Sequence, residues 1–131
     1  MKNLNEMSKA EMEQEISFAF DLREHKGLIQ SLVAEANQND PNWEWTVRRI
    51  SKNEARIFWS YLEYCDEAEL SFAVKLGDEN GRCWVEARDE HGWIIESEIV
   101  NDKELPFLNC PLDKAVEKMV RSIINTAHAC Y

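Results

Sequence analysis

Hydrophobic positions recur with helical spacing in the first 40 residues. Apolar side chains there are separated by three or four positions, which is typical of the buried face of an amphipathic helix. Ser8 and Glu11 form a capping-box pattern, and the basic residues before Gly27 suit the last turn of a helix that ends there. We therefore expect two helices, or one helix kinked at Gly27, over about residues 9–38.

The most regular helical pattern lies near the C-terminus. Pro111 suits the first turn of a helix, and Asp113 complements its positive end. The pattern predicts an amphipathic helix packed on a sheet. Its apolar positions are Leu112, Ala115, Val116, Met119, Val120, Ile123, Ile124 and Ala127.

Between the helical segments the hydrophobic period changes to two, which indicates strands. Residues 69–100 contain three alternating segments, separated by glycine-containing loops at 77–81 and 89–92. This arrangement predicts a three-stranded antiparallel meander. Residues 43–50 are rich in strand-forming residues and predict a further strand.

Residues 55–64 allow two interpretations. Ser51 and Glu54 form another capping-box pattern, which would start a helix. The aromatic and β-branched content favours a strand instead. With either outcome the fold class is α+β: a single domain over residues 1–131 forming a two-layer sandwich. It comprises an N-terminal helix or helix pair, an antiparallel meander of four to five strands, and a C-terminal helix packed on the sheet.

Composition places the chain among ordinary globular proteins, with 44% hydrophobic and 31% charged residues. No apolar run reaches the roughly 20 residues that span a bilayer. The polar, acidic start resembles neither a secretory signal nor a transit peptide. The four cysteines contain no C-x-x-C pair, so we expect reduced thiols in a cytoplasmic protein with no membrane partner.

The chain is acidic, with 15 Lys and Arg against 25 Asp and Glu and a net charge of −10. Direct binding of nucleic acid needs clustered positive charge and is disfavoured. Residues 66–104 hold 12 acidic and 4 basic residues, a net −8, so most of the excess lies in one stretch. A field of this sign attracts a basic partner.

Strand alternation predicts that one face of the sheet carries an aromatic residue surrounded by carboxylates. This is the composition of a protein-binding hot spot. The alternative is that residues 101–110 cover the tryptophan. The predicted partner-binding residues are Trp84, Glu86, Glu96 and Glu98 on that outer face, with Asp78, Glu79, Asp89 and Glu90 in the two loops.

Catalytic motifs are missing from the sequence: it has no G-x-G-x-x-G, P-loop, G-x-S-x-G or H-E-x-x-H pattern. We expect no catalytic residue, cofactor or metal. The alternative is a small metal-dependent enzyme that uses His91 with nearby carboxylates, which would require three or four converging ligands. A nucleophilic pair of Cys83 with His91 is disfavoured, because Cys83 is predicted to face the core.

Residues 111–115, with the sequence Pro-Leu-Asp-Lys-Ala after a tryptophan-containing strand, resemble the same region of small phage-encoded proteins. Small size, acidity and missing catalytic motifs are similar to those of immunity proteins and phage-borne inhibitors of host systems. From the acidic, aromatic face we expect a non-enzymatic protein that binds and inhibits a basic protein or a nucleic-acid-handling complex, as a phage-borne inhibitor or immunity-type protein with an anti-defence role as one form. A homodimer or a homo-oligomeric structural protein is the alternative.

Overall fold

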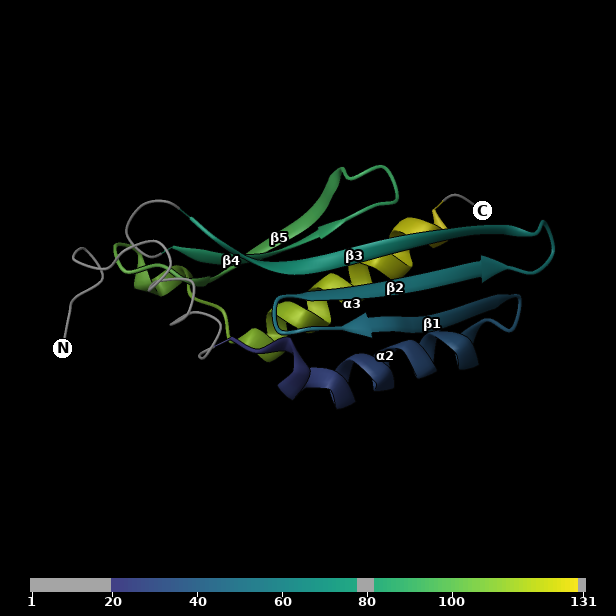
Figure 1. The fold of residues 1–131 in the computed structure, drawn as a ribbon, viewed down its shortest axis with the longest axis horizontal. Helices are drawn as coiled ribbons and strands as arrows, with labels where there is room; N and C mark the ends of the chain where they lie inside the picture. Colours follow the sequence, from purple (N-terminus) through teal and green to yellow (C-terminus); the bar gives the residue numbers. More distant parts are fainter. Residues whose placement is uncertain (1–19, 78–81, 130–131) are drawn as a thin grey trace.

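A five-stranded antiparallel sheet forms the centre of the computed structural model, which describes residues 20–77 and 82–129 (Figure 1). The strands are β1 (Trp43–Ile50), β2 (Glu54–Tyr61), β3 (Asp66–Leu76), β4 (Cys83–Arg88) and β5 (Ile94–Asn101). Each strand pairs with the next in the sequence, so the sheet is a meander in the order β1 to β5. This confirms the predicted α+β class and the five-stranded form of the predicted sheet.

Two helices cover one face of this sheet. A short 3₁₀ helix, η2 (Leu22–His25), leads into α2 (Lys26–Asn39), and a second, η3 (Pro106–Leu108), precedes α3 (Leu112–His128). In Figure 1 α2 runs alongside β1, while α3 crosses behind the sheet. The two helices pack on each other, and α3 also packs on β3, β4 and β5. None of the described helices is long and apolar enough to cross a membrane.

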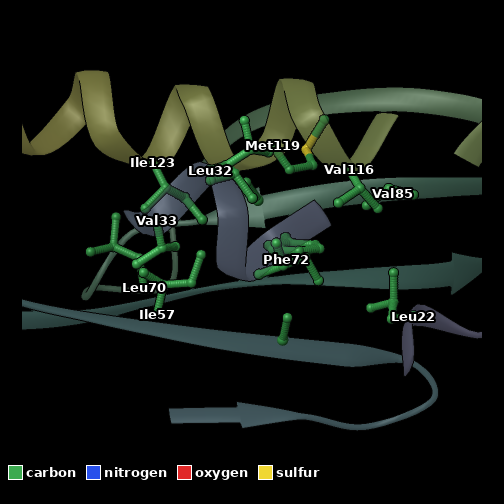
Figure 2. Packing of buried hydrophobic residues seen from close by; sticks show 14 of the residues in the cluster. Leu22, Leu32, Val33, Ile57, Leu70, Phe72, Val85, Val116, Met119 and Ile123 are labelled. Atoms are coloured by element: carbon green, nitrogen blue, oxygen red, sulfur yellow. The ribbon is translucent and has the colours of Figure 1, made fainter. Parts of the chain in front are cut away.

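The hydrophobic core lies between the helices and the inward face of the sheet. Side chains of α3 point toward the strands in Figure 2, where Val116 is drawn beside Val85 and Ile123 on the side of Val33 and Leu70. All the apolar positions predicted for the C-terminal helix are buried except Ile124, which is partly buried against the core. Alternate residues of β2, β3 and β4 complete the core: Ala55, Ile57, Trp59, Ala68, Leu70, Phe72, Val74, Cys83, Val85 and Ala87.

The predicted helix end at Gly27 is wrong, whereas the helix predicted after it is confirmed. The carboxylate of Asp21 accepts a hydrogen bond from the backbone N–H of Arg23 at 3.0 Å, which caps η2. The chain then continues directly into α2, and Gly27 lies in its first turn. The basic residues around Arg23 therefore precede a helix instead of ending one. The helix expected over residues 9–19 lies outside the described residues.

The ambiguous segment after residue 54 is a strand, as favoured. Ser51 N–H donates to the Glu54 carbonyl at 2.8 Å, and Glu54 N–H donates to Ser51 Oγ at 3.3 Å. The two residues that suggested a capping box therefore close the β1–β2 hairpin. Serine satisfies nearby backbone groups equally well in a turn, so the sequence pattern alone did not distinguish the two structures.

The face of the sheet away from the helices, called the open face below, presents charged and polar side chains. Arg48 Nη1 lies 3.3 Å from Glu69 Oε2, and its guanidinium carbon lies 3.7 Å from the centre of the Phe58 ring. Arg56 Nε pairs with Glu54 Oε1 at 2.7 Å. Ion pairs thus link side chains of β1, β2 and β3 across this half of the open face.

Candidate functional site

Trp84 and Glu86, two residues predicted to bind a partner, lie on the open face as expected, but they bond to each other. Trp84 Nε1–H donates to Glu86 Oε1 at 2.9 Å, and Arg88 Nε donates to Glu86 Oε2 at 2.6 Å. Arg88 also donates to the Gly92 carbonyl at 2.7 Å. Glu86 is only 4% exposed, and both oxygens of its carboxylate accept hydrogen bonds from side chains of its own strand.

The electrostatics of Glu86 follow from these contacts. Burial raises the pKa of this carboxyl, but the hydrogen bonds from Trp84 and Arg88 outweigh burial and leave the pKa below its ordinary value. Glu86 is therefore ionised at neutral pH, and the guanidinium of Arg88 matches its charge. It contributes little to the long-range attraction of a basic partner.

The prediction that Glu96 and Glu98 share this open face is wrong. Two β-bulges in the β4–β5 ladder set the register, and Glu98 lies opposite Val85 while Glu96 lies opposite Ala87. Both glutamates therefore point to the side of α3. Lys118 Nζ donates to Glu98 Oε2 at 2.7 Å and lies 3.9 Å from Glu96 Oε1. The hydrogen bond to Glu98 raises the pKa of Lys118, which keeps this lysine charged. The ion pair therefore links β5 to α3.

The loop carboxylates have separate roles. Asp78 and Glu79 lie outside the described residues. The Asp89 carboxylate accepts hydrogen bonds from the backbone N–H groups of His91 and Trp93, each at 2.9 Å, and so closes the β4–β5 turn. Glu90 is exposed, with Oε1 3.6 Å from His91 Nε2.

Strand alternation on its own predicts that Trp93 and Ile99 face the helices together with Ile95, and for Trp93 and Ile99 this prediction is wrong. Trp93 lies just before β5 and is 73% exposed, next to Ile94, which is 55% exposed. Ile99 lies opposite Trp84 and therefore on the open face. The β-bulges shift the alternation by one position, which sends apolar residues outward and the glutamates of β5 inward.

The loop of residues 101–110 does not bury its apolar residues on Trp84, which was the alternative considered for this tryptophan. Leu105, Phe107 and Leu108 stay exposed, at 44%, 79% and 39%. Trp84 is half-buried. Its ring lies so close to Gly77 that a Cβ added to this glycine would be 3.2 Å from the ring.

The β2–β3 hairpin carries exposed apolar residues that the sequence interpretation assigned to a strand. Leu62 is 53% exposed and Tyr64 is 63% exposed, both beyond the end of β2. Tyr61 Oη–H donates to Glu63 Oε2 at 3.0 Å, which raises the pKa of this tyrosine. A charge signal was present in the sequence: residues 57–74 contain four acidic residues and no Lys or Arg.

Residues 62–67 and 89–94 are called the acidic hairpin ends below. In a meander the β2–β3 and β4–β5 connections leave the same end of the sheet, and Figure 1 shows both loops on that side. Each hairpin end combines an exposed aromatic ring with at least one exposed carboxylate. This combination resembles the composition predicted for the outer face, but it is located at the end of the sheet.

A groove of about 280 Å³ separates the C-terminal halves of α2 and α3. His128 lies at one end, with its ring 4.8 Å from that of Trp43. In the part of the chain that the structure describes, the buried Nε2 of His128 has no hydrogen-bond partner, and neither has Nε1 of Trp45. The apolar lining residues are Leu32, Ala36 and Ile124, and the charged ones are Glu35 and Arg121.

The described residues contain neither of the two catalytic sites considered from the sequence, a metal site at His91 or a Cys83–His91 pair. Residues 20–77 and 82–129 contain no group of three or more His, Cys, Asp and Glu placed to hold a metal ion. Cys83 begins β4 and His91 follows the end of that strand, so they are not paired. Burial raises the pKa of the Cys83 thiol to about 12, which keeps it protonated.

Comparison with known proteins found no matching family, no similar curated protein and no similar solved structure. The molecule is thus classified by its fold, a five-stranded antiparallel meander backed by two helices.

Proposed function

We propose that the protein is a non-enzymatic binding protein whose acidic hairpin ends contact a basic surface of another macromolecule. One observation supports this proposal above the others: Trp93 and Tyr64 are 73% and 63% exposed, and each lies within a few residues of at least one exposed carboxylate. Large aromatic side chains supply most of the affinity at many protein interfaces, where they are surrounded by a polar rim.

The carboxylates that have no Lys or Arg partner in the described part of the chain indicate a positively charged binding partner. Glu86 is paired with Arg88, while Glu96 and Glu98 share Lys118, so these two cations offset two of the three negative charges. By contrast, Glu67 and Glu90 are exposed, and no Lys or Arg in the described ranges pairs with either. Carboxylates of this kind accelerate association with a positively charged surface.

The binding mode is that of an inhibitor or immunity-type protein, as in the phage-borne class that the sequence resembles. Occupying a basic surface blocks whatever that surface binds, and no chemistry by this chain is required. A basic protein or a nucleic-acid-handling complex offers such a surface, because phosphate recognition uses clustered Arg and Lys.

The test is capture of partners from host lysate at low salt, followed by titration of the identified partner as a purified protein. Trp93→Ala and Tyr64→Ala should each weaken binding about tenfold or more, since both remove a central aromatic contact. Phe107→Ala is the matched control, because this equally exposed ring lies in η3, outside the acidic hairpin ends.

Rising salt should weaken binding of wild type strongly. Binding that is unaffected by salt, or that falls equally in the Phe107 control, would contradict the proposal. A stable dimer of the purified chain in light scattering, abolished by Trp93→Ala, would instead support the homodimer alternative.

A further inference from the structure

A groove with positive lining residues lies between the first turns of α2 and the second half of β1. Its volume is about 420 Å³, and its described lining includes no Asp or Glu. This is unexpected in a chain with a net charge of −10. The lining of the groove includes Lys26 and Gln30 from α2, and Val47, Arg49 and Ile50 from β1.

β1 is an edge strand, because β2 pairs with only one of its sides. On the outer side, Asn37 Nδ2 donates to the Trp45 carbonyl at 3.0 Å, and Asn37 Oδ1 accepts from Trp45 N–H at 2.7 Å. Backbone groups alternate in direction along a strand, so the N–H and C=O of Val47 point to the same outer side. Across the described ranges no group bonds to Val47 on that side.

Two of the cations at the groove are not neutralised by any residue in the described ranges. Arg23 pairs with Asp21 at 2.7 Å, and the Arg48 guanidinium is turned to the open face by Glu69. Lys26 and Arg49 are exposed, and neither forms an ion pair with any described residue. Both line the groove, Lys26 from α2 and Arg49 from the β1 edge, where it lies opposite Arg56.

We propose that this groove binds an extended acidic peptide segment of a partner protein, which adds as a strand to the β1 edge at Val47. The backbone of the segment would pair with the N–H and C=O of Val47, as the Asn37 amide does at Trp45. Its carboxylates would contact Lys26 and Arg49. This mode of recognition combines main-chain hydrogen bonds for affinity with side-chain contacts for selectivity.

Charge and backbone chemistry favour this occupant over two others. A second copy of this chain paired antiparallel about Val47 would set Arg49 opposite Trp45, whose outward N–H and C=O are already bonded to Asn37. A nucleic acid would satisfy the cations, but its backbone offers no alternating amide and carbonyl groups to match Val47. The inference goes beyond the proposed function, because this partner is acidic and the groove lies apart from the acidic hairpin ends.

The experiment measures fluorescence anisotropy of a labelled short peptide of alternating Glu and Thr, titrated at low salt with the full chain. Wild type should bind, and the double variant Lys26→Glu/Arg49→Glu should lose about tenfold or more in affinity. The matched control is Lys103→Glu/Lys114→Glu, which changes net charge equally at exposed positions outside the groove and should bind nearly as wild type.

A second probe tests the backbone pairing without altering the protein. The same peptide with N-methylated amides keeps its charge but cannot donate main-chain hydrogen bonds, so it should bind at least about tenfold more weakly. Equal affinity of the two peptides would overturn strand addition. Tighter binding of a single-stranded oligonucleotide that displaces the peptide would identify a nucleic-acid site instead.

An absence of peptide binding at low salt would also overturn the inference. If, in addition, Lys26→Glu/Arg49→Glu self-associates in light scattering, the two cations serve only to keep the β1 edge from pairing with other copies.

Discussion

The side-chain amide of Asn37 bonds to both backbone groups of Trp45, with its Nδ2 at 3.0 Å from the carbonyl oxygen and its Oδ1 at 2.7 Å from the amide nitrogen. The amide thereby supplies to β1 the donor and acceptor that a neighbouring strand would supply. Asn37 lies on α2, so these two bonds also fix the helix against the edge of the sheet. An unpaired edge at this position would leave polar backbone groups beside the buried ring of Trp45.

Asn37→Leu removes both bonds and keeps a side chain of similar size. We expect it to lower the free energy of unfolding by about 2–3 kcal/mol, because two partly buried backbone groups lose their partners. Asn37→Asp keeps the acceptor but loses the donor, and should cost less. Urea denaturation followed by tryptophan fluorescence measures both changes.

Gln38→Leu is the control for the Asn37 variants. Its side chain is exposed one position along the same helix, so the change in unfolding free energy should stay within about 0.5 kcal/mol. Equal effects of the substitutions at 37 and 38 would show that helix propensity, and not the bonds to Trp45, determines the result.

Glu86 should make stability depend on acid pH. Its pKa in the folded protein lies below the ordinary value of 4.5, so the ionised form stabilises the fold. That contribution is complete above pH 4.5 and is lost as the pH falls through the lowered pKa. Glu86→Gln should be less stable than wild type at pH 7, by about 1–2 kcal/mol, since Arg88 loses its charged acceptor.

The difference between wild type and Glu86→Gln should shrink as the pH is lowered from 5 toward 3, measured by urea denaturation at each pH. Glu90→Gln is the control, because Glu90 is exposed, and its unfolding free energy should follow that of wild type at each pH. A difference at Glu86 that stays constant with pH would show that its charge does not stabilise the fold.

The sequence predicted elements well where one periodicity extended over many residues. The positions from Leu112 to Ala127 kept a helical period through four turns, and the structure buries that face. The strands between residues 69 and 100 were likewise marked by alternation and by glycine-containing turns. Local patterns of this length leave few competing conformations, so the elements were predictable.

The site was predicted less well, because its geometry depends on register and on contacts between distant segments. The bulges in β5 reverse the faces of Glu96 and Glu98, and alternation alone cannot reveal a bulge. Lys26 and Arg49 belong to separate segments that looked unremarkable individually. They become a pair only because α2 packs beside β1, which is a tertiary relationship.

The three described cysteines should react with an alkylating reagent in the order of their exposure, the most exposed first. Cys65 is exposed in the β2–β3 turn, Cys110 is half-buried with its pKa raised by burial, and Cys83 is fully buried with its pKa raised to about 12. With iodoacetamide at pH 8 we expect Cys65 to react first, Cys110 more slowly and Cys83 last, because the thiolate is the reactive form.

Peptide mass spectrometry over a time course measures the three labelling rates separately. The control is labelling in concentrated urea, where the three rates should converge as the thiols become exposed. Reaction of Cys83 as fast as Cys65 in the folded protein would contradict its placement in the core.

Among residues 20–77 and 82–129 the buried Nε2 of His128 has no hydrogen-bond partner; it lies beside an aromatic cluster, and this arrangement costs stability. His128→Phe keeps a ring against Trp43 and removes that nitrogen, so we expect the free energy of unfolding to rise by about 1 kcal/mol. His128→Ala removes the ring as well and should be destabilising. His91→Phe, at an exposed turn, should change little. A loss of stability in His128→Phe would mean that Nε2 has a partner in solution, and the groove between α2 and α3 would then hold an ordered water or a ligand.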